Sequence, residues 1–149
     1  MRAVAQRVTR ARITVGAEVV GEMGAGLLAL VGVGKGDGPE AADELARKLV
    51  HLRVFADAAD VNNASLLDTR GTLGVVSQFT LFGDARKGRR PSYFEAAPPE
   101  QAEPLVDRLA ETARAMGVAV VTGRFRAHMA VELANDGPVT ILLDTERRF

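Results

Sequence analysis

Apolar and polar residues alternate over the first fifteen positions of the chain, a pattern typical of a strand with one buried face. A shorter alternating segment, residues 18–20, lies between Gly16 and Gly21, so the two segments predict an opening hairpin. Residues 26–34 then form a continuous apolar run bounded by glycines, which predicts a central strand covered on both faces. The amino-terminal part of the chain is therefore expected to build the middle of a sheet.

Two later segments carry apolar residues at helical spacing. Residues 39–51 begin with Pro39, which is favoured in a first turn, and repeat apolar side chains every three or four positions. Residues 99–116 show the same period, with Pro104 near the first turns and Gly117 as a stop at the carboxyl end. Both segments predict amphipathic helices that pack one face against the sheet.

The remaining segments predict further strands and loops. Residues 52–55, 72–82 and 118–122 are strand-like, and residues 57–68 are polar and predict a loop. Two more strand-like runs, 129–134 and 139–143, flank an Asn-Asp-Gly-Pro sequence. Because Asn, Asp and Gly tolerate left-handed backbone angles, residue chemistry alone favours an ordinary hairpin turn there. Strands interspersed with two main helices, without a repeat or linker, predict one α/β domain over residues 1–149 with a mixed, mostly antiparallel sheet.

Composition narrows the class of protein. Hydrophobic residues make up 47% and charged residues 26% of the chain, which argues against disorder, and no apolar run approaches the length of a membrane span. The absence of cysteine and of an apolar leader leads us to expect a cytoplasmic protein without membrane contact. Nineteen basic residues balance nineteen acidic ones, so any contact with RNA must come from a local patch.

The usual catalytic side chains are scarce. The chain has no cysteine nucleophile, and its two histidines, His51 and His128, show no ligand spacing. A metal site or a Ser-His-Asp triad is therefore poorly supported, and we expect neither a metal nor a cofactor. A lone histidine is more often structural than catalytic.

Residues 83–99 form a long segment rich in basic and aromatic side chains. A solvated loop explains a basic run by itself, and it is preferred on this observation alone. The alternative is a patch that contacts RNA phosphates and stacks on bases. The side chains concerned are Arg86, Lys87, Arg89, Arg90, Tyr93 and Phe94.

Three motifs stand in a specific order along the chain. They are Ser-Gln-Phe-Thr-Leu at 77–81, Lys-Gly-Arg-Arg-Pro-Ser at 87–92 and Asn-Asp-Gly-Pro-Val-Thr at 135–140. Together with the opening Met-Arg-Ala-Val-Ala-Gln-Arg-Val, they resemble the D-aminoacyl-tRNA deacylase family over the whole chain. The resemblance implies a homodimeric esterase that removes D-amino acids, and also glycine, from the 3′-terminal ribose of tRNA. It also implies that the active site is shared between the two subunits.

The resemblance assigns roles to two groups of residues. Ser77, Gln78, Phe79 and Thr80 would form the catalytic segment that lines the pocket and positions the substrate. The second group would bind the substrate or hold the chain that does so. It consists of Gly137, Pro138, Met129, Asn135 and Arg7.

In this family the Gly-Pro bond is cis and enters the partner subunit's pocket. Gly137 and Pro138 would act there through their carbonyl oxygens, which exclude L-amino acids, and Arg7 matches a position that supports this loop. Two residues depart from the family pattern: Arg126 stands where glycine is usual, and Ala130 stands where a longer polar residue is common. Both departures concern the wall of the pocket on the side of the adenosine.

Ester hydrolysis does not require histidine, cysteine or a metal. An enzyme can orient the activated ester and offer backbone N–H groups to the developing oxyanion, with help from a hydroxyl of the ribose. Thr80 as a nucleophile is the competing mechanism, but the sequence shows no base to activate it. Two other functions remain open at this point: a dimeric RNA-binding module without catalysis, and a general hydrolase of small esters.

Overall fold

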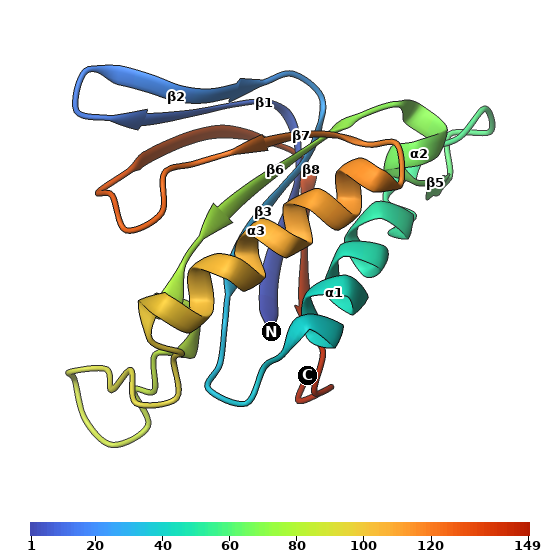
Figure 1. Cartoon of the computed structure of the whole chain (residues 1–149). Helices are drawn as coiled ribbons and strands as arrows, with labels where there is room; N and C mark the ends of the chain where they lie inside the picture. Colours follow the sequence, from blue (N-terminus) through green and yellow to red (C-terminus); the bar gives the residue numbers. More distant parts are fainter.

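The computed structural model describes all residues from 1 to 149 and places two long helices side by side on one face of a curved sheet (Figure 1). The long helices are α1 (Pro39–His51) and α3 (Pro99–Ala115), and α2 (Leu66–Thr69) and the 3-10 helix η1 (Phe79–Phe82) are short. The predicted α/β class with two main amphipathic helices is confirmed. The strands are β1 (Arg2–Val15), β2 (Glu18–Met23), β3 (Gly26–Gly32), β4 (Phe55–Ala56), β5 (Asn62–Ala64), β6 (Thr72–Ser77), β7 (Ala119–Thr122) and β8 (Ala130–Asp144).

The main sheet is mixed and mostly antiparallel, as predicted. Its strand order is β2-β1-β3-β6-β7, with β8 also paired to β1. Strand β1 is antiparallel to β2, β3 and β8, whereas β3 pairs with β6 and β6 with β7 in parallel. The opening hairpin and the central position of β3 are therefore confirmed, and the small β4–β5 pair forms a separate sheet.

The main core lies between the two long helices and the sheet. Leu45 and Leu49 of α1 and Leu109 of α3 are fully buried against Leu27 and Leu73 of the sheet. Burying one such side chain contributes about 1.5–3 kcal/mol relative to leaving it exposed, and most of the buried apolar residues belong to this core. None of these helices has the length and apolar character that a membrane span requires.

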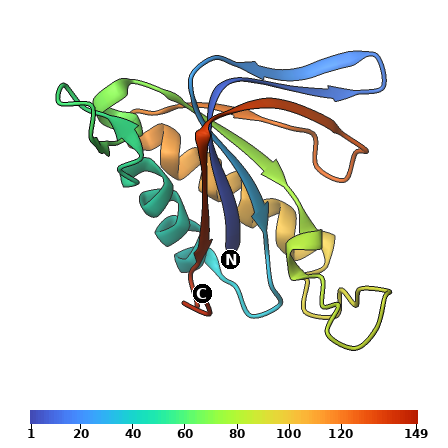
Figure 2. The same ribbon diagram turned by 180° about the vertical axis from the view of Figure 1, so that it is seen from behind.

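A smaller apolar cluster lies on the sheet face that the helices do not cover, which Figure 2 shows from behind. It includes Ile13, Leu28 and Val76. Strand β2 approaches β7 closely beside this cluster, because a Cβ added to Gly21 would lie 2.7 Å from the Val121 side chain. The sheet therefore curls almost into a barrel, with glycine permitting the contact.

A charged contact joins the two long helices on their outer side. The Arg108 guanidinium of α3 donates to both carboxylate oxygens of Asp43 in α1, at 2.9 Å each, and the Thr112 hydroxyl donates to the same carboxylate at 2.9 Å. These hydrogen bonds, first from Arg108 and then from Thr112, lower the pKa of Asp43 to about 2. The ionised carboxylate is thus the form that connects the helices.

The prediction of a hairpin turn at residues 135–138 is wrong. Both halves of β8 pair with the same strand, since Leu142 lies opposite Val4 and Glu132 lies opposite Arg12. The chain therefore keeps its direction, and the register slips so that Asn135 faces Val8 while Thr140 faces Gln6. The intervening residues form a bulge that projects from the ladder.

Three other segments differ from the sequence-based prediction. The strand expected over residues 72–82 ends at Ser77, because Gln78 leaves the extended region and η1 begins at Phe79. The expected loop 57–68 contains β5 and α2, and α2 begins at a reciprocal cap between Ser65 and Asp68. The strand expected at 52–55 is reduced to Phe55–Ala56.

Candidate active site

A cavity of about 620 Å³ lies at the carboxyl ends of the parallel strands β3 and β6. The first turn of α3 and the loop between β7 and β8 complete its wall. Four consecutive residues predicted for the site, together with Met129, reach this cavity. The lining residues are Leu30, Val33, Val76, Ser77, Gln78, Phe79, Thr80, Ala97, Pro99, Ala102, Phe125, Arg126, Ala127, His128, Met129 and Val131.

The turn after β6 determines how the catalytic segment enters the cavity. The Gln78 backbone N–H donates to the carbonyl of Val31 at 2.7 Å, so β6 stays attached to β3 as the chain turns into η1. The Gln78 side-chain amide donates to the Thr80 hydroxyl at 3.0 Å. Phe79 is 55% exposed and meets the ring of Tyr93 edge to face, with centroids 5.1 Å apart. The segment is thus held by its own contacts.

The loop between β7 and β8 supplies cavity residues that sequence reasoning missed. Phe125, Ala127 and His128 line the cavity, although no motif in the sequence indicated that they would. No hydrogen bond joins His128 to Thr80, whose hydroxyl has an amide donor as its side-chain partner. Arg126 has a φ of 64°, in the left-handed region that favours glycine. The usual glycine of the family pattern would suit this backbone.

The Gly-Pro bulge is closed at its base by one side chain. The side-chain oxygen of Asn135 accepts a hydrogen bond from the Val139 backbone N–H at 3.0 Å. The side-chain amide nitrogen of Asn135 donates to the Thr140 hydroxyl at 3.0 Å. The Gly137-Pro138 peptide bond is cis, as the family resemblance implied. Gly137 has a φ of 128°, and a Cβ added there would lie 2.9 Å from the Val139 side chain, so only glycine fits without strain.

Arg7 joins this bulge to the β4–β5 region. Its Nε donates to the backbone carbonyl of Asp136 at 3.1 Å, and a terminal nitrogen donates to the Val54 carbonyl at 2.6 Å and to Asn62 Oδ1 at 3.1 Å. The Arg7 side chain is only 14% exposed, whereas both Gly137 and Pro138 are exposed. A partly buried cation therefore holds an exposed loop in position.

The bulge and the cavity lie at different places on the chain. Neither Gly137 nor Pro138 lines the cavity, and neither do Arg7 and Asn135. Arg7 faces Leu27 near the start of β3, whereas the cavity begins at Leu30, about 10 Å further along the strand at roughly 3.3 Å per residue. Apart from Met129, the residues of the second predicted group therefore lie away from the cavity of their own chain.

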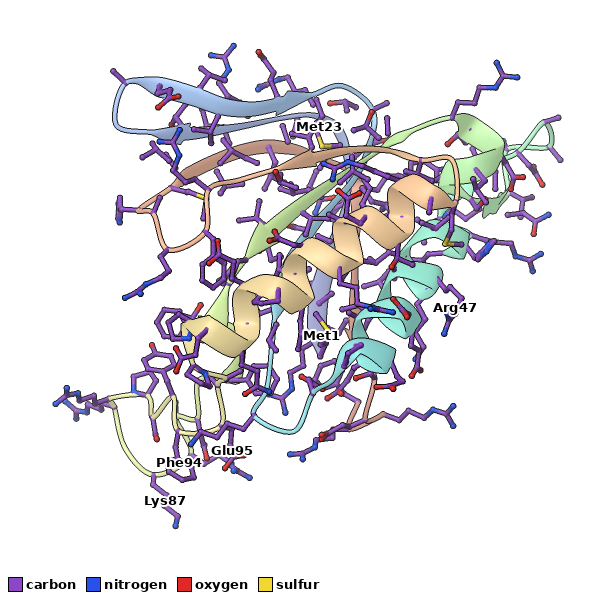
Figure 3. All side chains as sticks on the ribbon, in the orientation of Figure 1. Met1, Met23, Arg47, Lys87, Phe94 and Glu95 are labelled. Carbon is purple, nitrogen blue, oxygen red and sulfur yellow. The ribbon has the colours of Figure 1, made fainter.

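The basic segment projects as a loop beside the cavity, and Figure 3 shows Lys87 and Phe94 on it. Two backbone hydrogen bonds between Asp84 and Ser92 close its base. Arg86 pairs with Asp84 at 2.7 Å, and its hydrogen bonds hold the pKa of that carboxyl well below its usual range. The other cations, Lys87, Arg89 and Arg90, are exposed and form no ion pair.

A sequence model of the family described as D-Tyr-tRNA(Tyr) deacylase matches residues 4–144. The chain belongs to this family. It is 56% identical to a D-aminoacyl-tRNA deacylase from Symbiobacterium thermophilum over 149 residues, which cover 100% of this chain and 99% of the relative. It is also 60% identical to a D-aminoacyl-tRNA deacylase from a Roseiflexus species over 145 residues, 97% of this chain and 94% of the relative.

Solved structures show the same fold. A structure described as the c-Myc DNA Unwinding Element Binding Protein superposes with a TM-score of 0.91 at 38% identity, covering 97% of this chain and 99% of that one. A probable eukaryotic D-amino acid tRNA deacylase gives a TM-score of 0.82 over 95% of this chain, and at 17% identity it supports the fold alone.

Membership of the deacylase family confirms the expectation of an ester hydrolase acting on aminoacyl-tRNA, so a binding module without catalysis is not supported. Within this enzyme the cavity holds one histidine, one arginine and no carboxylate. No cluster of three or more His, Cys, Asp or Glu side chains that could hold a metal ion occurs in the structure. The polar groups at the cavity are therefore hydroxyl, amide, imidazole, guanidinium and backbone groups.

Proposed function

We propose that this protein hydrolyses the ester between a D-amino acid, or glycine, and the 3′-terminal ribose of tRNA, and that it does so in the cytoplasm. The observation that carries the proposal is the cavity at the ends of β3 and β6, which contains the whole Ser77–Thr80 segment. Its volume of about 620 Å³ suits an amino acid together with its ribose, since small-molecule sites commonly span about 300–1,000 Å³.

Backbone donors at the start of η1 are suited to the chemical step. The first N–H groups of a helix lack an intrahelical acceptor, so those of Phe79 and Thr80 are our proposed donors to the substrate. In the proposed reaction they bind the ester carbonyl oxygen while water attacks the carbonyl carbon. The bond to the ribose oxygen then breaks, and that oxygen takes up a proton as the free amino acid leaves. The neighbouring ribose hydroxyl assists this proton transfer, and Thr80 positions the substrate.

The Gly-Pro bulge is proposed to select the chirality of the substrate. The carbonyl oxygens of Gly137 and Pro138 would occupy the space that an L side chain needs, while D residues and glycine fit. Support comes from the exposure of both residues and from the bracing by Arg7 and Asn135. Backbone atoms present the same wall to every side chain, so selectivity would come from exclusion.

A homodimer would bring the bulge of one subunit to the cavity of the other. Since Gly137 and Pro138 do not line the cavity of their own chain, a second chain is needed for them to act on the substrate. The sheet face without helices offers a surface for this contact, because Leu142 is 56% exposed and Val4 and Leu30 are only half-buried. A two-fold axis would bury this face and complete two equivalent sites.

A deacylation assay with matched tRNA tests the proposal. One tRNA is charged with D-tyrosine, L-tyrosine or glycine, and the release of each amino acid is followed with enzyme in catalytic amounts. We expect rapid hydrolysis of the D and glycyl esters and little of the L ester. Equal hydrolysis of both tyrosyl esters would contradict the gate, and protection of all three esters would indicate a binding protein. Hydrolysis of D-tyrosine ethyl ester at the same efficiency would indicate a general esterase.

A further inference from the structure

Arg126 is the only charged side chain among the residues that line the cavity, apart from the titratable His128. Its guanidinium is exposed and takes part in no ion pair or side-chain hydrogen bond. Arg124, two residues earlier, differs in this respect because it pairs with Glu18 at 3.0 Å. The cavity therefore has one unpaired cation and no carboxylate that competes for it.

The backbone at Arg126 makes its presence costly. A φ of 64° is unfavourable for any residue with a Cβ, and glycine would remove this cost. The side chain forms no ion pair or side-chain hydrogen bond that would offset it. Strain that persists without a structural benefit points to a functional role at the site. Arg126 lies on the loop between β7 and β8, which Figure 1 shows projecting beyond the ends of these two strands, and residues of this loop line the cavity.

We propose that the Arg126 guanidinium binds the phosphodiester attached to the terminal nucleoside of the substrate. The inference rests on the proposed function, because an ester on the 3′-terminal ribose brings that phosphate to the cavity as its nearest anion. A guanidinium presents a planar fork that can donate two hydrogen bonds to phosphate oxygens. Arg126 is then a binding residue that places the ribose, and with it the ester, against the Ser77–Thr80 segment.

Two minimal substrates isolate this contact. One is adenosine carrying a D-tyrosyl ester on its ribose, without phosphate, and the other is the same ester on the dinucleotide CpA. We expect the parent enzyme to prefer the dinucleotide by about ten-fold in kcat/KM, the size of one charge-assisted hydrogen bond. Arg126→Gln should lose this preference through a raised KM with kcat unchanged, and Arg126→Lys should restore part of it.

Arg126→Gly separates binding from backbone strain, and Arg70→Gly is its matched control. Arg70 also has a left-handed φ, 55°, but lies at the end of α2 and does not line the cavity. Both glycine variants should keep or raise Tm, whereas only Arg126→Gly should lose the preference for the dinucleotide. Arg124→Gln controls for the loss of a nearby positive charge, and it should keep the preference.

The outcomes are distinguishable. If the parent hydrolyses both minimal substrates equally, or if Arg126→Gln keeps the preference, the phosphate-binding role is wrong while the deacylase function stands. If the parent hydrolyses neither minimal substrate nor D-aminoacyl-tRNA, the proposed function itself fails. A lower Tm and lower kcat in Arg126→Gln, with the preference intact, would show that the residue is merely structural.

Discussion

The Thr80 hydroxyl receives a hydrogen bond from the Gln78 amide, and no His, Asp or Glu side chain forms a hydrogen bond with it. We therefore expect Thr80→Ala to lower the rate of D-tyrosyl-tRNA hydrolysis by about ten-fold, the loss of one positioning hydrogen bond, without abolishing it. His128→Asn should also retain turnover. A metal chelator should leave the rate of hydrolysis unchanged. Single-turnover deacylation at saturating enzyme is the measurement. Abolished turnover with intact tRNA binding in Thr80→Ala would favour a threonine nucleophile.

Arg7 donates to the Gly-Pro bulge and to the β4–β5 region, so it fixes one relative to the other. Arg7→Gln should loosen the bulge and reduce the ratio of D to L hydrolysis by about ten-fold, corresponding to roughly 1.4 kcal/mol of lost discrimination. Arg12→Gln is the control, because this arginine of the same strand forms an exposed pair with Glu22. If Arg7→Gln keeps the ratio of D to L hydrolysis of the parent enzyme, Arg7 does not support the bulge.

At the scale of single residues, the sequence indicated one part of the candidate site and missed another. Ser77–Thr80 were recognisable because a polar end on an apolar strand required an explanation and matched a motif. His128 and Phe125 carry no such signal, since a lone histidine or phenylalanine in a loop resembles any other. Their place at the cavity depends on how the β7–β8 loop folds back over the sheet.

At the scale of elements, the Asp43 carboxylate connects α1 to α3. Its pKa, about 2 in the folded protein, lies below the value of 3.8 expected for the unfolded chain. The stabilisation is therefore present above about pH 4 and is lost as the pH falls through 2. Asp43→Asn should lower Tm by a few degrees at pH 6 and by almost nothing near pH 2. Glu44→Gln, which removes a partly exposed pair with Lys48 within α1, should change Tm less.

The basic loop offers a second prediction at this scale. Lys87, Arg89 and Arg90 have no ion-pair partner, so they are free to bind phosphates. Replacing Arg89 and Arg90 by alanine should weaken tRNA binding and reduce the slope of log Kd against log salt by about one to two. Arg86→Ala should change the slope less, because Asp84 already neutralises this side chain. An unchanged slope in the double variant would indicate a merely solvated loop.

The sequence predicted the long elements better than the irregular ones. Periodic apolar positions located both long helices within one residue, because the side chains on the buried face of a helix recur every three or four positions. The bulge at residues 135–138 could not be distinguished from a hairpin, since Asn-Asp-Gly-Pro suits both. Which one forms depends on β1 being long enough to pair with both halves of β8, a distant contact.

At the scale of the whole molecule, the sheet face that the helices leave uncovered is the proposed interface of a homodimer. Light scattering at micromolar concentration should give twice the chain mass of 15.8 kDa. Leu142→Lys should shift this mass toward the monomer and lower deacylation in parallel, because it places a charge on the proposed interface. Val19→Lys is the control, since this residue is similarly exposed, at 48% against 56% for Leu142, but lies on β2. A monomeric parent enzyme that remains active would contradict the shared site.

The pairing of β1 with β8 has a consequence for synthesis on the ribosome. β1 is among the first segments to emerge, and one of its edges pairs with β8 from Arg2 opposite Asp144 to Thr14 opposite Ala130. Until β8 leaves the exit tunnel, that edge of 14 residues exposes unpaired backbone groups to other nascent chains. A chain that is truncated before Ala130 therefore keeps an open template for intermolecular strand pairing, and we expect chaperones and proteases to act on such fragments.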